Sequence, residues 1–201
     1  KSQETEYGYS YAAYRPASDG ETYWRFGQFL YPFWTMPPIG AIDHNFLTRA
    51  YIPIDDENCM IVVIEKKGIL ASVLRGEERP KGHPGVAYED NYLPRTTDWQ
   101  GRWKLVENRA NDYQIDRDMQ RGESYTGLMG FVLQDQMITE SMGPISDRTH
   151  EHLAPSDVMI TRTRRCLVKA ATEFAKDGSL PDSARDPSIF DGVRGGFFVA
   201  D

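Results

Sequence analysis

Residues 156–178, SDVMITRTRRCLVKAATEFAKDG, decide the fold of this chain. Ser156 is a favoured N-cap residue, and Gly178 with the nearby Pro181 is a typical helix stop, so the segment predicts one long helix. Such a helix can cover one face of a β-sheet, for which the preceding sequence provides the strands. The positions that recur at helical spacing along its apolar stripe are Met159, Ile160, Thr163, Cys166, Leu167, Ala170, Ala171, Phe174 and Ala175.

The first third of the chain predicts an antiparallel sheet. Residues 7–15 and 23–33 alternate in side-chain character, are rich in aromatic residues and are separated by a Pro- and Gly-containing turn, which predicts a β-hairpin. Residues 45–54 and 58–66 predict two more strands joined by an acidic turn. Together with the long helix, they predict an α+β fold: a curved antiparallel sheet packed against the C-terminal helix, with a pocket between them.

Between the strands and the long helix the pattern is less regular. Residues 67–102 contain many Gly and Pro and little periodicity, which predicts a long surface excursion that serves as a lid or a subunit contact. Residues 125–141 predict a second helix. Gly127 and Gly130 weaken its start by roughly 1 kcal/mol each relative to Ala, and we expect them to let another segment or a ligand come close.

Composition and charge exclude several classes of function. The 201 residues include 40% hydrophobic ones, enough for a core, and 23 basic against 30 acidic residues leave no basic patch for a nucleic acid. No apolar run approaches the roughly 20 residues that span a bilayer, so no membrane association is expected. Cys59 and Cys166 lie far apart in positions typical of packing, which favours a cytoplasmic protein.

Most motifs of known chemistry are absent from the sequence. There is no Gly-rich nucleotide loop, no Ser nucleophile elbow and no paired-Cys motif. His150 and His152 are the only histidines close in sequence. Residues two apart share a face only in extended structure, so a surface role is the better interpretation and a metal site the alternative.

A collinear set of motifs nevertheless resembles one known family. The later members are residues 125–130 (YTGLMG), 134–135 (QD), 140–153 (ESMGPISDRTHEHL), 156–157 (SD) and 164–167 (RRCL). The earlier members are residues 7–9 (YGY), 23–25 (YWR), 32–33 (PF), 53–57 (PIDDE) and 111–117 (NDYQIDR). This set resembles the C-terminal part of the oxygenase component of Rieske non-heme iron aromatic ring-hydroxylating oxygenases of the phthalate dioxygenase type. It is also similar to enzymes that O-demethylate lignin-derived aryl ethers.

The resemblance implies a helix-grip catalytic domain that holds mononuclear Fe(II) through two histidines and one carboxylate. The family's carboxylate lies in a Glu-Asp or Gln-Asp pair, which maps onto Gln134 and Asp135, so Asp135 is the predicted catalytic and metal-binding residue. We expect it on an apolar helix face with Leu128, Phe131, Val132, Met137 and Ile138, where a buried carboxylate needs a cation partner. A solvent-facing or arginine-paired aspartate is the alternative.

Two features of that family are missing from these residues. Its Rieske domain holds a 2Fe-2S cluster through Cys-x-His and Cys-x-x-His pairs, and its iron histidines form a close pair on a helix; neither pattern occurs here. The resemblance therefore implies that residues 1–201 are one catalytic domain, the C-terminal part of a longer subunit, and inactive alone. It also implies a homo-oligomer, a trimer or hexamer, that receives electrons from a reductase or ferredoxin through a neighbouring subunit's Rieske cluster.

Arginines in the aromatic strands are candidates for binding substrate. An aromatic acid needs an apolar slot with a cation at its mouth, and a guanidinium suits a carboxylate. Arg25 is the first candidate and Arg49 the second, with Arg15 behind them. Strand alternation places Arg25 on one face with Gly27, whose missing side chain leaves room for a ligand. A strand arginine stacked on a tyrosine or paired with an acid is the alternative for each.

Two classes of function remain open at this point. In the first, the domain uses Fe(II), O2 and electrons from a Rieske cluster to dihydroxylate an aromatic acid or to O-demethylate an aryl ether. In the second, it is a non-enzymatic helix-grip domain that binds an apolar ligand. The resemblance favours the first class, with Asp135 as the iron ligand and Arg25 and Arg49 as candidates for the substrate's acidic group.

Overall fold

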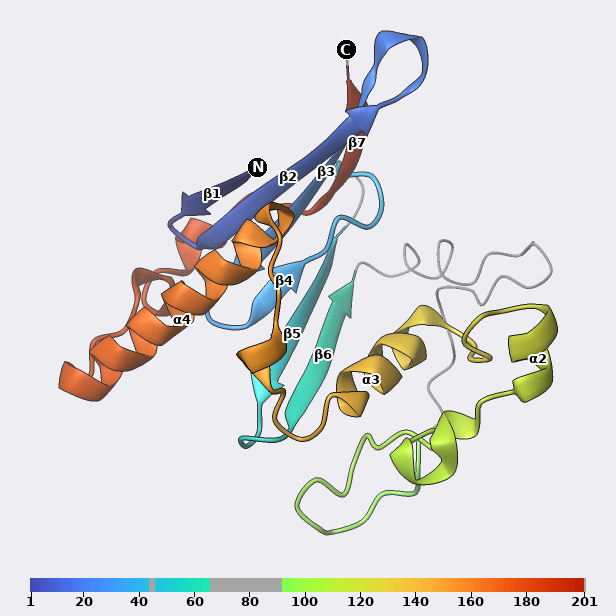
Figure 1. The fold of residues 1–201 in the computed structure, drawn as a ribbon. Helices are drawn as coiled ribbons and strands as arrows, with labels where there is room; N and C mark the ends of the chain where they lie inside the picture. Colours follow the sequence, from blue (N-terminus) through green and yellow to red (C-terminus); the bar gives the residue numbers. More distant parts are fainter. Residues whose placement is uncertain (44–45, 66–91, 201) are drawn as a thin grey trace. The chain divides into compact units, whose positions relative to one another are not determined.

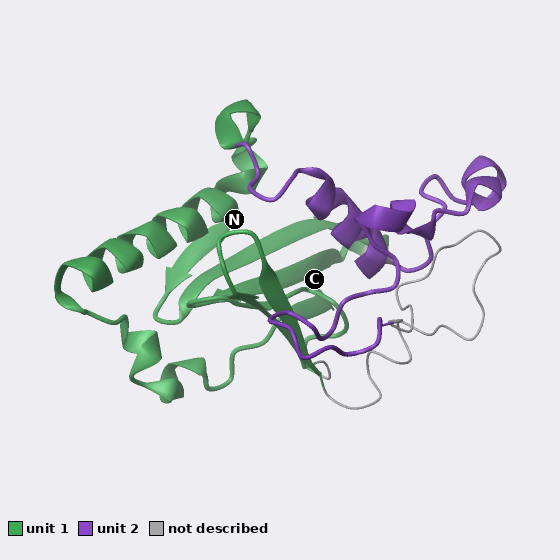
Figure 2. Ribbon diagram, turned by 90° about the horizontal axis from the view of Figure 1, so that it is seen from below, with its two compact units in different colours: residues 1–69, 148–201 green, residues 70–147 purple. Residues whose placement is uncertain are grey.

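The computed structural model describes residues 1–43, 46–65 and 92–200 and divides into two compact units (Figures 1 and 2). One unit comprises residues 1–69 and 148–201, and the other residues 70–147. Most of the predicted excursion, residues 67–91, lies outside the described residues. In the parts of the chain that the structure describes, no helix is long and apolar enough to cross a membrane.

The first unit contains a seven-stranded antiparallel sheet. Six strands follow each other across it in chain order: β1 (Ser2–Thr5), β2 (Gly8–Pro16), β3 (Thr22–Leu30), β4 (Trp34–Met36), β5 (Leu47–Pro53) and β6 (Cys59–Glu65). The last strand, β7 (Gly196–Ala200), also pairs with β3. It can do so because β4 occupies only the last three residues of β3 and leaves the first half of that edge free. The strand nearest the C-terminus therefore returns to the middle of the sheet.

The predicted strands are confirmed as β2, β3, β5 and β6, with the expected antiparallel pairing. The second strand ends at Leu30 rather than at residue 33, because residues 31–33 form a turn. Strands β1, β4 and β7 were not predicted. They have three to five residues each, too few for side-chain alternation to be recognised.

The long helix is confirmed as α4 (Val158–Asp177), with a 3₁₀ turn before it (Pro155–Asp157). It ends as predicted at Gly178, which adopts φ 75° and donates its N–H to the Phe174 carbonyl. The capping prediction for Ser156 is wrong by one residue, because this residue lies inside the 3₁₀ turn and Asp157 occupies the N-cap position.

Helix α4 packs on one face of the sheet, over β1 and β2 (Figure 1). Its Arg162 donates hydrogen bonds to the carbonyl and the Oγ of Ser2, at 2.7 and 2.8 Å. On the same face, Tyr9 of β2 and Phe29 of β3 lie directly opposite each other and are buried. The predicted α+β fold, an antiparallel sheet packed against the C-terminal helix, is therefore confirmed.

Only the first part of the apolar stripe contributes to this packing. Cys166 and Leu167 are half-buried, whereas every residue from Ala171 to the helix end is exposed, including Phe174 at 57%. The prediction that the whole stripe covers the sheet is wrong for its last two turns. In the described residues, the sheet does not extend far enough along the helix to bury them.

The opposite face of the sheet carries a row of aromatic side chains. Tyr14, Trp24, Phe26 and Phe198 follow each other with ring centroids 5.0, 6.0 and 5.6 Å apart, and Phe26 stacks on Phe198 at 10°. These residues come from β2, β3 and β7, so the row joins three strands through cross-strand pairs. Contacts of this kind favour the register in which β7 pairs with β3.

The second unit contains α2 (Arg117–Gly122), α3 (Phe131–Ser141) and a 3₁₀ segment (Arg109–Gln114). Its core comprises Tyr113, Leu128 and Leu133, with Leu105, Ile115 and Met137 packed around them. The predicted helix over residues 125–141 starts only at Phe131, because Gly127 and Gly130 adopt φ 64° and 74°. As expected, Gly127 permits a close approach, since a Cβ there would lie 2.4 Å from the Asp116 carbonyl oxygen.

Gly27 offers a test of the packing within the sheet. A Cβ on this residue would lie 2.2 Å from Cε1 of Tyr11, the residue directly opposite on β2. We expect Gly27→Ala to lower the free energy of unfolding by about 1–3 kcal/mol, because the tyrosine ring must move. Urea denaturation measures the effect. Gly122→Ala, where no atom would lie within 4 Å, is the control, and equal stability of both variants contradicts the packing described here.

Candidate functional site

The predicted iron ligand, Asp135, lies on the outer side of α3. Leu133 of this helix is buried in the core of the second unit, at 5% exposure. Asp135 is exposed, together with Val132 and Ile138, which lie three residues before and after it. Among the described residues, its carboxylate forms no ion pair and no hydrogen bond. The expectation of a buried carboxylate with a cation partner is therefore wrong, because Leu133 and Met137 turn the other side of the helix inward.

An exposed, unpaired carboxylate is available to bind a cation. Aspartate oxygens are ordinary ligands for Fe(II), and Asp135 has no competing basic partner in the part of the chain that is described. No group of three or more His, Cys, Asp or Glu side chains gathers in these residues to complete a metal site. A carboxylate is chemically suited to be one ligand of an iron centre, but the described residues gather no further donors around Asp135.

Two side-chain hydrogen bonds join α3 to other segments of the unit, and a third lies within the helix. The Tyr113 hydroxyl donates to Oε2 of Glu140 at 2.5 Å, and Gln136 donates to Oε1 of the same carboxylate at 2.8 Å. At the other end of the helix, Gln134 donates to the Leu128 carbonyl at 3.1 Å. Burial, followed by the hydrogen bond to Glu140, raises the pKa of Tyr113 to about 12, so its hydroxyl is protonated at neutral pH.

Tyr113 reaches α3 from an unusual backbone segment. Asp112, Tyr113 and Gln114 adopt φ values of 53°, 53° and 51°, which side chains with a Cβ rarely occupy. Such conformations cost on the order of 1–3 kcal/mol each and persist where surrounding contacts determine them. Here the Asn108 carbonyl accepts the Tyr113 N–H at 2.9 Å, and Asp112 pairs with Arg117. The motif NDYQIDR was noted in the sequence, but no pattern in it indicates the role of Tyr113.

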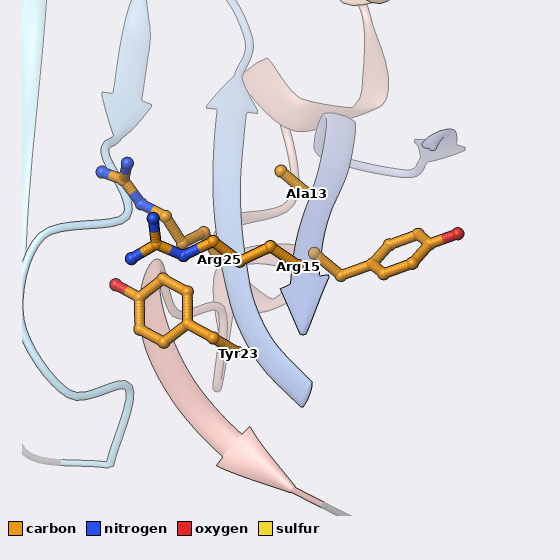
Figure 3. A pocket seen from close by; sticks show the side chains of 5 residues that line it. Ala13, Arg15, Tyr23 and Arg25 are labelled. Atoms are coloured by element: carbon orange, nitrogen blue, oxygen red, sulfur yellow. The ribbon is translucent and has the colours of Figure 1, made fainter. Parts of the chain in front are cut away.

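Arg25 lines a small open depression in the first unit. Strand pairing brings Arg15, Tyr23 and Arg25 to one face of β2 and β3, where they surround a volume of about 200 Å³ with Ala13 (Figure 3). Arg25 is exposed and donates to the Pro38 carbonyl at 3.3 Å. Neither arginine pairs with a carboxylate among the described residues. Two guanidinium groups at one opening suit an anionic ligand.

Two details of this depression differ from the sequence-based expectation. The space beside Gly27 is filled by the Tyr11 ring, so it leaves no room for a ligand. The Arg15 guanidinium lies 5.0 Å from the centroid of the Tyr23 ring, which matches the alternative of an arginine stacked on a tyrosine. Arg25 is thus the arginine of the pair that is not stacked on Tyr23.

Arg49, the second candidate for substrate binding, does not line this depression. It lies half-buried on β5, opposite Thr35 of β4 and Val63 of β6. Arg25 occupies the half of β3 that pairs with β7, whereas β4 separates β5 from the other half. The structure therefore does not bring the two candidate arginines to one site.

Near α4, Glu151 lies in an ion-pair network with two arginines, and no metal-binding group of side chains forms among the described residues. Glu151 pairs with Arg148 at 3.3 Å and accepts two hydrogen bonds from Arg164, one of them at 2.8 Å. Arg164 lowers the pKa of Glu151 through the hydrogen bond to its carboxylate. His150 and His152 are exposed, and His44 and His83 lie outside the described residues.

The fold and the site define a class: an α+β domain with an antiparallel sheet, a long C-terminal helix and one available carboxylate on a separate helix. Residues 1–184 match the family described as LigXa C-terminal domain like, and the chain belongs to this family. The resemblance to the C-terminal helix-grip domain of Rieske oxygenases is thereby confirmed.

Two relatives support the same assignment. The chain is 40% identical over 200 residues to the 3-chlorobenzoate-3,4-dioxygenase oxygenase subunit of Comamonas testosteroni, a match that covers 98% of this chain and 46% of that subunit. It is 27% identical over 177 residues to the phthalate 4,5-dioxygenase oxygenase subunit of Pseudomonas putida, covering 86% of this chain and 37% of that subunit. The chain therefore spans less than half the length of either relative.

The raised pKa of Tyr113 predicts that part of the free energy of unfolding is lost at alkaline pH. Its pKa rises from 10.0 to about 12 in the folded state, so its contribution is present below pH 10 and is lost as the pH rises toward 12. We expect the stability difference between the parent and Tyr113→Phe to shrink by roughly 1 kcal/mol between pH 9 and pH 11, about half of the full effect. Urea denaturation of both proteins at pH 9 and pH 11 measures it. A constant difference contradicts the raised pKa.

Proposed function

We propose that this chain is the catalytic domain of a Rieske-type oxygenase subunit, with residues 1–201 forming one domain in the C-terminal part of a longer protein. The observation that carries the proposal is the match over 98% of the chain to a protein named as a dioxygenase oxygenase subunit. The 2Fe-2S cluster and the iron histidines would lie outside this chain. A non-enzymatic domain that binds an apolar ligand is not favoured, because both relatives are named as oxygenase subunits.

Asp135 is the residue of this chain that we propose to hold the mononuclear iron. Its exposed, unpaired carboxylate is available, and it occupies the position to which the family's motif maps. When bound, Fe(II) supplies the redox chemistry that activates O2. Val132 and Ile138 lie on the same exposed side of α3 as this carboxylate.

An aromatic acid is the proposed substrate, and Arg25 is the proposed anchor for its acidic group. The Arg25 guanidinium, which forms no ion pair among the described residues, lines the depression beside Arg15 and Tyr23 (Figure 3). The names of both relatives contain an aromatic acid, chlorobenzoate in one and phthalate in the other. The reaction would dihydroxylate the ring or remove a methyl group from an aryl ether. Arg49 remains the second candidate and would contact a different part of the substrate.

The proposed partners follow from the reaction class. Electrons would come from a reductase or ferredoxin and reach the iron through the Rieske cluster of a neighbouring subunit, which requires a homo-oligomer, a trimer or hexamer. Phe174, in the exposed last two turns of α4, is a large apolar side chain at 57% exposure that such an assembly could bury. A cytoplasmic location is part of the same proposal.

Replacement of Asp135 tests the proposed iron site. In the complete subunit, we expect Asp135→Ala to empty the mononuclear site and abolish turnover, because one of three protein ligands is lost. The visible absorption of the Rieske cluster should remain, which shows that the subunit is folded. Iron analysis and absorption spectra measure both quantities. Asp118→Ala, on exposed α2, is the control, and normal mononuclear iron content in Asp135→Ala contradicts the assignment.

Replacement of Arg25 tests the proposed substrate anchor. A charge-assisted hydrogen bond is worth about 1.5–3 kcal/mol, so Arg25→Gln should raise the KM for an aromatic acid by roughly one to two orders of magnitude. The iron content should stay unchanged. Arg165→Gln, at an exposed position of α4, is the control. An unchanged KM makes Arg25 a structural residue. Equal turnover of an uncharged analogue by parent and variant contradicts the acidic substrate.

A further inference from the structure

Tyr113 forms a hydrogen bond with Glu140 of α3, the helix that also carries Asp135. The tyrosine is 6% exposed, and its hydroxyl donates to the Glu140 carboxylate at 2.5 Å. The same carboxylate accepts a hydrogen bond from Gln136, the residue that follows Asp135 in the chain. We infer that Tyr113 and Glu140 are positioning residues that set the rotation of α3 and thereby the direction of the Asp135 carboxylate toward iron. This inference rests on the proposed role of Asp135 as an iron ligand.

The geometry of an α-helix gives this contact control over Asp135. Each residue advances about 100° around the axis, so Glu140 and Leu133 lie about 140° and 160° away from Asp135. Contacts of Leu133 and Glu140 on the inner side therefore determine where the outer side points. An apolar contact such as that of Leu133 tolerates small rotations because it has no preferred direction, whereas a hydrogen bond weakens steeply when it is misaligned. The Tyr113–Glu140 bond is the directional contact of the pair.

The backbone around Tyr113 supports a role beyond packing. Three consecutive residues adopt φ values above 50°, and these bring the tyrosine under α3. An aromatic ring could fill the core from an ordinary conformation, but the hydroxyl reaches Glu140 from this one. Strained backbone of this kind concentrates near functional sites, where surrounding contacts hold it. The Asn108 carbonyl, which accepts the Tyr113 N–H at 2.9 Å, is one of those contacts.

The first test removes the hydroxyl and keeps the ring. In the complete subunit we expect Tyr113→Phe to fold, to bind Fe(II) about tenfold more weakly at the mononuclear site and to broaden the electron paramagnetic resonance signal of its nitrosyl adduct. Tyr125→Phe, the same change at a fully exposed tyrosine of this unit, should alter neither quantity. Ile115→Val trims the same core without touching the hydrogen bonds. It should lower the unfolding midpoint but leave Fe(II) affinity unchanged.

A second pair of variants tests the acceptor. Glu140→Gln keeps a carbonyl oxygen for the tyrosine and should retain Fe(II) affinity within about threefold. Glu140→Ala should lower Fe(II) affinity about tenfold. The double variant Tyr113→Phe/Glu140→Ala should bind Fe(II) no more weakly than Glu140→Ala alone, because both changes remove the same hydrogen bond. Glu140→Ala alone decides the question if Tyr113→Phe does not fold, since Glu140 is only half-buried.

The outcomes separate this inference from the proposed function. If Asp135→Asn binds Fe(II) as the parent does, Asp135 is not a ligand and the proposed function fails. If Asp135→Asn loses iron while Tyr113→Phe and Glu140→Ala keep parental affinity and a parental nitrosyl signal, the positioning role is overturned and the iron assignment stands. The role is also overturned if Ile115→Val weakens Fe(II) binding as much as Tyr113→Phe, because loss of stability then explains both effects.

Discussion

The pairing of β3 with three other strands is the constraint on which the first unit depends. Its whole length pairs with β2, its first half with β7 and its last three residues with β4. Buried backbone N–H and C=O groups must be paired, so a central strand cannot lose a neighbour without exposing a row of unsatisfied groups. The strand also carries Arg25 and Tyr23 of the depression and Phe29 under α4. The proposed substrate anchor and the residues that pack under α4 therefore lie on the same strand.

In the second unit, polar contacts as well as the small hydrophobic core hold the segments together. The core of Tyr113, Leu128 and Leu133 is small, and the 3₁₀ segment is held by side chains that replace regular backbone pairing. The Asn108 N–H donates to Oδ1 of Asn111, and the Asn111 side-chain amide donates to the Val106 carbonyl. Asp112 pairs with Arg117. Directional contacts of this kind restrict the orientation of α3 more than a small apolar core does. Such contacts would suit the proposed role of Asp135, whose carboxylate would have to point toward iron.

Much of the fold could be predicted because the signals were local. Alternation revealed β2 and β3, and Gly178 marked the end of α4. The start of α3 was missed because the sequence does not show that Gly127 and Gly130 take positive φ. The exposed side of α3 follows from the core that packs on its other side, and this core includes Tyr113, which lies more than 20 residues from Asp135 and reaches the helix through a left-handed segment without a sequence signature. Arg49 was grouped with Arg25 because both lie in aromatic strands, but the insertion of β4 separates them. Side-chain alternation predicts on which face of a strand a residue lies, but it does not predict which other strands lie beside that strand in the sheet.

The return of β7 to the middle of the sheet has a consequence for biosynthesis. Its residues 196–200 pair with residues 22–26, so the central ladder closes between segments that are far apart in the order of translation. Contacts of high sequence separation form slowly, because a long chain must be ordered before they are made. Until β7 emerges from the ribosome, the first half of β3 presents an unpaired edge beside exposed Trp and Phe side chains. Such an edge can recruit a strand from another nascent chain, so this part of the sheet is where chaperone protection would matter most.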